Sequence, residues 1–326
     1  MNNEDYKKRV DQQIEQYRNV PSMHVDLPSI GQYYKDVYVK PAVKEVFDVD
    51  NHYQFYFKFF KEALSKSGNK QLISLGAGDG EIEVQVAKLL TAEGIEFHFS
   101  LAEVSQIQLD RAQDKVEKEG LTDFFSYEQV DLNNWHPTKR YCGVMAHHSL
   151  HHIVELERVF DSVKDSLDGF FCTMDMIGRN GHMRWPEVLD LINRIWPLIP
   201  KAKRVHKVLN GFEELFYNHD CSSEGFEGIR AEDILPSLIE RFGFHAFYAY
   251  GGIPDPFVGR GFGHHYDITD DWDRAFIDLV AYLNELLIDL DYVKPTQMYA
   301  VLTSDTSSTP RVIGRRDPIF CVRPKA

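Results

Sequence analysis

QLISLGAGDG at residues 71–80 is an apolar stretch that closes on three glycines. The residues before the first glycine have the composition of a buried strand, and EIEVQVAKLLTAEG at 81–94 has the spacing of a helix. Glycines at such a junction let the backbone turn tightly and approach a ligand, and the helix N-terminus behind them offers free N–H groups. The stretch therefore predicts a strand, a ligand-binding turn and a helix.

Strand and helix patterns alternate outward from this stretch. Apolar strands are predicted at 97–104, 124–131, 143–148 and 170–178, with helices at 105–120 and 155–169 between them. The alternation resumes with a helix at 231–242 and strands at 244–252 and 296–303. Alternation at this interval favours parallel strands in a sheet that is covered by helices on both faces.

The predicted organisation is one α/β core with additions. We expect an N-terminal helical cap at 1–65, the first part of the core at 66–178, the rest of the core at 179–304, and a loosely held tail at 305–326. Within the third segment, insertions at about 179–230 and 252–295 should lie over the carboxyl edge of the sheet, where open α/β sheets bind ligands.

Composition excludes several classes of protein. The 326 residues include 36 Lys plus Arg and 50 Asp plus Glu, and the net charge of −14 disfavours binding to nucleic acid. The polar start MNNEDYKKRVDQQIEQYRN lacks a secretory signal, and no run of about 18 apolar residues predicts a membrane span. The four cysteines lack the CxxC spacing of zinc sites, so we expect reduced thiols in a cytoplasmic protein.

The glycine turn does not fit two common phosphate-binding motifs. A dinucleotide site requires glycine where this chain has Glu81, and a P-loop requires Gly-Lys-Ser/Thr. Acidic residues instead end the next two strands, at Glu103 and Asp131. Glu103 could accept both hydroxyls of a ribose, and Asp131 an adenine amino proton, because both belong to the same edge of the sheet. Helix-capping roles for these two acids remain the alternative.

From Gln71 to Gly178 the chain resembles the class I S-adenosylmethionine-dependent methyltransferases, with a weaker match near 244–251 and 296–303. The resemblance implies a Rossmann-like sheet of seven strands, with S-adenosylmethionine as cofactor and S-adenosylhomocysteine as product. It places the methionine part at the glycines, the ribose at Glu103 and the adenine at Asp131. The cofactor-binding residues implied are Gly76, Ala77, Gly78, Asp79, Gly80, Glu103, Val104, Asp131, Leu132, Ala146 and His147.

One position departs from the family pattern. Many members carry an acid two residues before the first glycine, where this chain has Ser74. Asp79, or backbone carbonyls near Ala146, would then contact the ammonium group of the methionine part.

Fourteen histidines include the clusters HHSLHH at 147–152 and His264-His265. A metal needs three or four converging ligands, and the first cluster turns at most two side chains one way, so no metal is expected. Leu150-His151 resembles the stretch of plant-type O-methyltransferases whose histidine is the general base, although His152 and Ile153 replace its Asp-Trp. A structural or cofactor-side role for His151 is the alternative.

The loop after the fifth predicted strand carries many polar residues. In the family it lies beside the transferable methyl group, which makes Asp175 and His182 further catalytic candidates. Arginines in such a loop suit a carboxylate or phosphate on the substrate, although salt bridges to nearby acids are an equal alternative. The candidates for substrate binding, on this loop and on two Gly-rich segments expected to act as lids, are Arg179, Asn180, Arg184, Arg230, Arg260, His264, His265 and Tyr266.

The leading hypothesis is methyl transfer to an O, N or C nucleophile of a small molecule. RNGHMRWPE at 179–187 and EGFEGIR at 224–230 are similar to a group of bacterial methyltransferases without a firmly assigned acceptor. The resemblance leaves a homodimer open. Alternatives are a protein that binds S-adenosylmethionine without transferring its methyl, as a regulator or in other sulfonium chemistry, and a protein or nucleic-acid methyltransferase. The negative charge and the missing Asn-Pro-Pro-Tyr-type motif speak against nucleobase amines.

Overall fold

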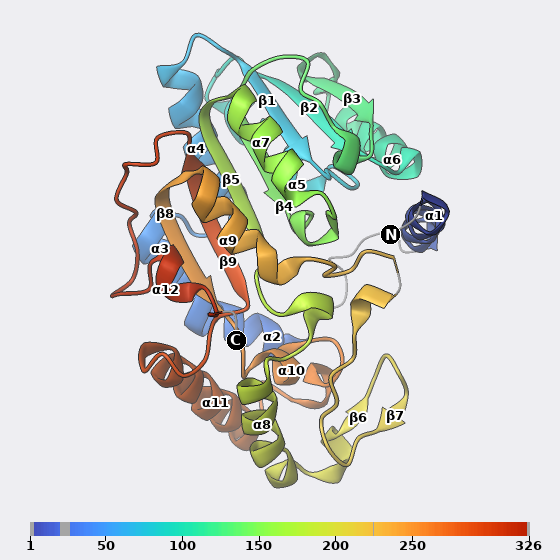
Figure 1. Ribbon diagram of the computed structural model, residues 1–326, viewed down its shortest axis with the longest axis vertical. Coiled ribbons are helices and arrows are strands. Elements are labelled where there is room, and N and C mark those ends of the chain that lie inside the picture. The colour runs from blue at the N-terminus through green and yellow to red at the C-terminus, as the bar shows by residue number, and fades with distance from the viewer. Residues whose placement is uncertain (1–2, 20–26, 224, 325–326) are drawn as a thin grey trace.

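The computed structural model describes residues 3–19, 27–223 and 225–324, so parts of the predicted cap, first insertion and tail lie outside the described residues. Its centre is a sheet of seven strands in the order β3-β2-β1-β4-β5-β9-β8, with β9 antiparallel to both neighbours (Figure 1). The predicted Rossmann-like sheet is therefore confirmed. Its strands are β1 Gln71–Leu75, β2 His98–Glu103, β3 Phe125–Gln129, β4 Tyr141–His147, β5 Leu167–Met176, β8 Gly243–Tyr250 and β9 Gln297–Thr303.

Helices cover both faces of this sheet, as predicted. In Figure 1, α7 and α9 lie in front of the sheet and α3 and α4 lie behind it. Each face has its own apolar layer, one containing Phe60 and Phe99 and the other containing Phe160 and Phe171. The helices of these layers are α3 Lys40–Phe47, α4 His52–Lys66, α5 Glu81–Ala92, α6 Gln106–Lys118, α7 Leu156–Ser166 and α9 Ala231–Arg241.

The strands are apolar because they are covered on both sides. In β4 every residue from Tyr141 to Ala146 is buried, which gives a nearly continuous apolar run and not an alternating one. Glycine at position 143 lets Phe60 of α4 pack against the sheet, since an added Cβ would lie 2.7 Å from its ring. The strands β1 to β5 are paired in parallel, so their carboxyl ends meet at one edge of the sheet. The loops at this edge form the site described below.

The two predicted insertions lie together beyond the carboxyl edge, in the lower part of Figure 1. The first contains α8 Pro186–Ile195 and the short strands β6 Val205–His206 and β7 Gly211–Phe212. The second contains α10 Asp255–Val258 and α11 Asp271–Asp289. Trp196 holds the two together, because its ring packs against Phe257 and Phe262 at centroid distances of 6.0 and 4.9 Å.

The tail is not loosely held, contrary to the expectation from its composition. Arg316 donates to Glu285 at 2.5 Å and to Asp289 at 2.8 Å, both on α11. Arg323 pairs with Glu187 of α8 at 2.9 Å, just after the short helix α12 Pro318–Cys321. Arginine side chains thus attach a segment that has few apolar residues.

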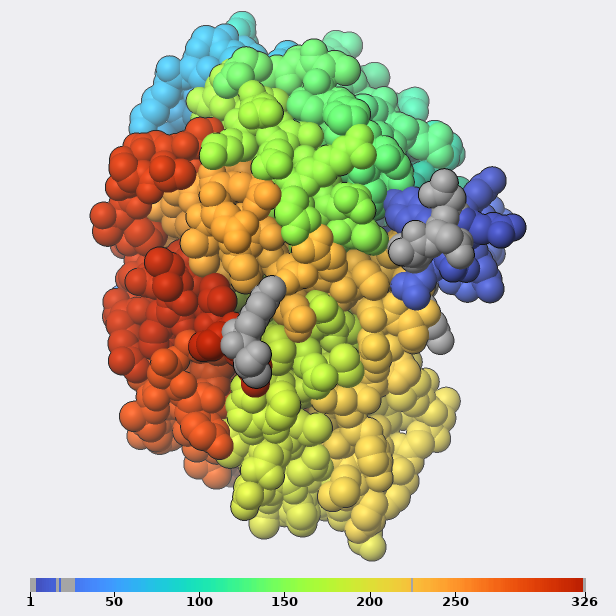
Figure 2. All heavy atoms as spheres, viewed as in Figure 1, coloured from blue at the N-terminus to red at the C-terminus, as the bar shows by residue number. Residues whose placement is uncertain are grey.

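The N-terminal part contains α1 Asn3–Asn19 and α2 Ser29–Tyr34, which leads through a π-helical turn at Lys35–Val39 into α3. Figure 2 shows α1 in dark blue at the flank of the molecule. Arg9 of α1 donates to the carbonyl oxygen of Ser222 at 3.0 Å. None of the helices in the described part of the chain has the length and apolar composition needed to cross a membrane.

Candidate active site

A groove of about 770 Å³ lies at the edge where the parallel strands end. Its volume falls within the range of small-molecule sites, about 300–1,000 Å³. The residues predicted from the sequence that line it are Gly76, Ala77, Gly78, Asp79, Glu103, Val104, Asp131, Leu132, His147, His151, His182 and Arg260. The other cofactor and catalytic candidates, Gly80, Ala146 and Asp175, are not among the lining residues but belong to the loops and strand ends around it.

The glycine turn forms one wall of the groove. Gly76, Gly78 and Gly80 all have positive φ angles, of 74°, 54° and 70°. At Gly76 an added Cβ would lie 2.5 Å from the Cβ of Ser149, whose hydroxyl donates to the carbonyl oxygen of Leu75 at 2.6 Å. The turn after β1 therefore packs directly against the loop after β4, and only glycine fits there.

Glu103 is the last residue of β2, and its side chain supports the glycine turn. Its two carboxylate oxygens accept hydrogen bonds from the backbone N–H groups of Gly78 and Ser105, each at 3.0 Å. Burial raises the pKa of this carboxyl group, and the backbone donors oppose the rise. A buried acceptor group thus lies beside the turn and lines the groove.

Asp131 has a partner that the sequence did not suggest. The hydroxyl of Tyr6, on α1, donates to it at 2.6 Å and accepts from the side-chain amide of Asn133 at 2.7 Å. Burial and the nearby carboxylate raise the pKa of Tyr6 well above its ordinary value. The Tyr6 ring also contacts Phe226 at a centroid distance of 5.3 Å. Helix α1 therefore closes the groove at the end where Asp131 lies.

An acid that the sequence did not suggest, Glu83, lies in the first turn of α5 and lines the groove. It is 2 % exposed, and the Ser74 hydroxyl donates to its Oε1 at 2.5 Å. Its Oε2 is buried and has no hydrogen-bond partner among the described residues. Burial raises the pKa of Glu83 to about 7, against the opposing effect of the Ser74 hydrogen bond. A carboxyl group with an unused buried oxygen therefore lies directly beside Ser74.

His151, which lines the groove, forms a buried pair with Asp175. Nδ1 of His151 lies 2.6 Å from Oδ1 of Asp175, which is completely buried at the end of β5. The backbone N–H of Leu150 donates to the second oxygen of Asp175 at 2.8 Å. The carboxylate therefore fixes the orientation of the imidazole ring and directs its Nε2 away from β5.

Glu227 joins this pair from the loop before α9. Its Oε1 lies 3.4 Å from Nε2 of His151 and 2.7 Å from Nε2 of His182, and its Oε2 lies 3.6 Å from Nε2 of His152. Three imidazole nitrogens thus converge on one carboxylate. His182 adopts this position with φ of +55°, a left-handed backbone that non-glycine residues seldom adopt.

The charges in this cluster differ from those of free histidines, which titrate near neutrality. Burial opposes the protonated form of His151, but Asp175 and Glu227 together raise its pKa to about 10. Burial and the neighbouring His151 lower the pKa of His152 to about 3. The pKa of Glu227 is lowered despite its burial, because His151 and His182 donate to it. The two carboxylates therefore favour the protonated form of His151.

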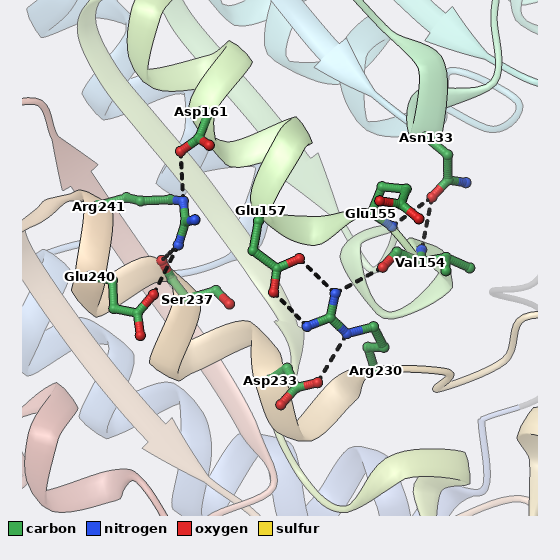
Figure 3. A network of polar contacts seen from close by, with 10 residues as sticks. All are labelled: Asn133, Val154, Glu155, Glu157, Asp161, Arg230, Asp233, Ser237, Glu240 and Arg241. Atoms are coloured by element: carbon green, nitrogen blue, oxygen red, sulfur yellow. Dashed lines mark hydrogen bonds and ion pairs between the residues drawn. The ribbon is translucent and has the colours of Figure 1, made fainter.

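Arg230, predicted to bind substrate, is taken up by an ion-pair network outside the groove lining (Figure 3). Its guanidinium donates to both carboxylate oxygens of Glu157, at 2.6 and 2.7 Å, and to Asp233 at 2.9 Å. It also donates to the carbonyl oxygen of Val154 at 2.9 Å. The salt-bridge alternative, which was considered for the arginines of the loop after the fifth strand, therefore describes Arg230 of the later Gly-rich segment.

The structure does not bring most of the other predicted substrate residues to the groove. The Tyr266 ring packs on Phe276 of α11 at a centroid distance of 5.7 Å, and Nε2 of His265 lies 2.7 Å from the carbonyl oxygen of Val205. Arg260 does line the groove. Those outside the lining are Arg179, Asn180, Arg184, His264, His265 and Tyr266.

Neither a protein-family model nor a curated protein matches the chain. Solved structures match at low identity. An O-methyltransferase of a trans-AT PKS multienzyme from Brevibacillus brevis, in complex with S-adenosylhomocysteine, is 11% identical over 88% of this chain and 86% of its own, with a TM-score of 0.46. A geranyl diphosphate C-methyltransferase from Streptomyces coelicolor is 10% identical over 91% of this chain and 98% of its own, with a TM-score of 0.46. The [4+2]-cyclase SpnF is 14% identical over 87% of this chain and 100% of its own, with a TM-score of 0.42.

Proposed function

We propose that this chain is an S-adenosylmethionine-dependent methyltransferase that acts on an O, N or C nucleophile of a small molecule. The observation that carries the proposal is a single groove that joins the glycine turn, Glu103 and Asp131 to the histidine cluster around His151. The first group suits a nucleoside cofactor, and the second suits proton movement at an acceptor. One groove therefore offers space for both reactants of a methyl transfer.

The cofactor would lie along the ends of β1, β2 and β3. Glu103 is placed to accept hydrogen bonds from the ribose hydroxyls, since it lines the groove beside the glycine turn. Asp131 and Leu132 are placed at the adenine, where Tyr6 of α1 covers Asp131. Carboxylates at the ends of successive parallel strands suit the polar edges of a nucleoside.

Glu83 would take the role of the acid that many family members carry at the position of Ser74. The methionine part of the cofactor ends in an ammonium group, and the Oε2 of Glu83 is a buried acceptor without a partner among the described residues. A buried carboxylate is stable when a cation pairs with it. Glu83 is therefore favoured over Asp79, which already pairs with Lys115 at 2.8 Å.

The sulfonium supplies the driving force for transfer, so the protein has to align the acceptor and manage its proton. The histidine–carboxylate cluster lines the groove and would receive that proton at a ring nitrogen that is neutral in the reacting complex. His151 is its central residue, since it contacts Asp175 through one ring nitrogen and faces Glu227 through the other.

The cofactor assignment predicts binding of S-adenosylmethionine and S-adenosylhomocysteine at micromolar concentration. Either ligand should raise the melting temperature, because a ligand at 100 times its Kd stabilises the native state by about 2.7 kcal/mol. Calorimetry measures the affinity, and NAD serves as the matched nucleoside control that should not bind. No binding of either sulfur compound would contradict the proposal.

Transfer itself is tested with S-adenosylmethionine that carries a labelled methyl group and a small-molecule extract of cells. Label should move to the small-molecule fraction. Binding without any movement of label would instead favour a protein that uses the cofactor in other chemistry. Label on protein or nucleic acid, in an unfractionated extract, would favour the macromolecular alternative.

A pH dependence tests the role of Glu83. The pKa of its carboxyl group is raised to about 7, so the group is neutral at lower pH and negative at higher pH. Binding of the ammonium group should therefore tighten roughly tenfold from pH 6 to 7.5. Asp79 raises the pKa of Glu83 and Lys115 lowers it, so the two neighbours act in opposite directions. Calorimetry of wild type and Glu83→Gln measures the effect, and the glutamine variant should lose the dependence. An equal dependence in both proteins would assign it to another group.

A further inference from the structure

The histidine cluster contains more metal-ligating atoms than the removal of one proton requires. Among the residues that the structure describes, His151, His152 and Glu227 form one group whose ligand atoms all lie within 4.8 Å of one another. We propose that these three residues, all of which line the groove, form a binding site for a divalent cation of the zinc type. The sequence predicted no metal, because Glu227 is distant from the histidines along the chain.

The spacing of the three ligands suits a small tetrahedral ion. Zinc lies about 2.0–2.1 Å from nitrogen and oxygen ligands, so neighbouring ligands around it are about 3.3–3.4 Å apart. Nε2 of His151 is 3.4 Å from Oε1 of Glu227, and Nε2 of His152 is 3.6 Å from Oε2. The two distances involve different oxygens of Glu227, so the carboxylate and the rings must draw together to hold one ion between them.

The surroundings hold two of these ligands, His151 and Glu227, in orientation. A ligating histidine usually donates its other ring N–H to a carboxylate, which fixes the ring and makes it a better ligand. Asp175 provides this support to Nδ1 of His151, and the backbone of Leu150 fixes Asp175 in turn. His182 contacts Glu227 at 2.7 Å from the opposite side.

The backbone brings the ligands together from two separate segments. His151 and His152 lie in the short helix Leu150–His152 after β4, and Glu227 precedes α9. The N–H of Ile229 donates to the carbonyl oxygen of His151 at 3.0 Å, which ties the two segments beside the ligands. The left-handed backbone of His182, also in contact with Glu227, shows that the arrangement tolerates local strain, which is typical of functional sites.

The ligand types select the ion. Two imidazoles and one carboxylate suit zinc, cobalt or iron, whereas magnesium and calcium prefer oxygen ligands alone. Three protein ligands leave a fourth position open, and all three line the groove. The inference rests on the proposed function only for the occupant of that position, which would be an oxygen or nitrogen of the methyl acceptor.

Metal binding is tested directly on tag-free protein that has been treated with a chelator. Cobalt(II) should bind in one equivalent and give the strong visible absorption of a four-coordinate site, and zinc should displace it while magnesium should not. X-ray absorption of the zinc-loaded wild type should show two imidazoles and no sulfur. This readout needs no variant to fold.

Variants identify the site. His152→Ala and Glu227→Gln should abolish stoichiometric binding, and Asp175→Asn should weaken it about 10–100-fold, because it removes only the support of His151. His98→Ala is the matched control, since His98 lies at the start of β2, at the opposite edge of the sheet. This variant should bind cobalt like the wild type.

S-adenosylmethionine is titrated into the same samples to separate the two proposals. Cofactor binding without cobalt binding would overturn the metal site and leave the proposed function in place. Cobalt binding without cofactor binding would overturn the proposed function alone. Cobalt that binds equally well to His152→Ala and Glu227→Gln, or a zinc spectrum without imidazole, would place the ion elsewhere and overturn the inference.

Discussion

Replacing His151 with alanine is expected to lower the rate of methyl transfer about 10²–10⁴-fold, the usual loss when a proton-transfer group is removed. His151 links the buried Asp175 to Glu227. The Nε2 atoms of His152 and His182 approach Glu227, not Asp175. Binding of S-adenosylmethionine should stay within a few-fold of the wild type, since the acids assigned to its nucleoside are elsewhere. The measurements are label transfer into a small-molecule extract and calorimetry of the cofactor.

The control must separate a lost reaction from a lost fold. Removing the imidazole leaves Asp175 as a buried charge without its partner, and such a loss costs about 3–5 kcal/mol of stability. His151→Gln keeps an N–H donor for Asp175 without the imidazole, so it should melt closer to the wild type and still be slow. A rate within a few-fold of the wild type in both variants would show that His151 is structural.

The fold could be predicted because its signals are local. QLISL before the glycines has the apolar character of a strand buried on both faces, and β1 is Gln71–Leu75. The three glycines have positive φ angles, and glycine adopts such angles readily, so glycines after a strand indicate a tight turn. The tail was misjudged because its attachment depends on ion pairs, such as Arg316 with Glu285, between distant parts of the chain.

The acid beside Ser74 could not be located from the sequence. In α5 three consecutive residues are buried, Ile82, Glu83 and Val84, because this helix packs against α4 and α6 as well as the sheet. A helix on a sheet is expected to bury one stripe, which would leave one of three consecutive residues exposed. The signal available was a glutamate within an apolar helix face, and only the packing shows that it points to the groove.

In the segment EGFEGIR the sequence drew attention to Arg230, whereas the structure places Glu227 of the same segment against the histidines. Arginine was favoured as the substrate ligand, yet Arg230 lies between Glu157 and Asp233. Glu227, three residues earlier, faces the histidines instead. Tyr6 was missed for the same reason, since its contact with Asp131 joins residues 125 positions apart. Such contacts depend on tertiary packing, which no local pattern specifies.

Replacing Glu103 with alanine is expected to weaken binding of S-adenosylmethionine by about 1–3 kcal/mol, or roughly 5–150-fold, since hydrogen bonds to a charged group are lost. The effect should exceed that of Tyr6→Phe, which removes only a hydroxyl from the cover over Asp131. Glu128→Ala is the matched control, because Glu128 lies on β3 beside Ala102 and does not line the groove.

Glu103 also supports the glycine turn, so its loss has a second consequence. The N–H groups of Gly78 and Ser105 would lose their acceptor, and the melting temperature without ligand should fall. Glu103→Gln distinguishes the two effects, because its amide oxygen can still accept from one of these groups while the negative charge toward the ribose is gone. If Glu103→Gln and Glu103→Ala both bind S-adenosylmethionine like the wild type, the ribose does not lie at the end of β2. The cofactor would then have to occupy the groove in another orientation, with the glycine turn supporting the loop after β4 and not a ligand.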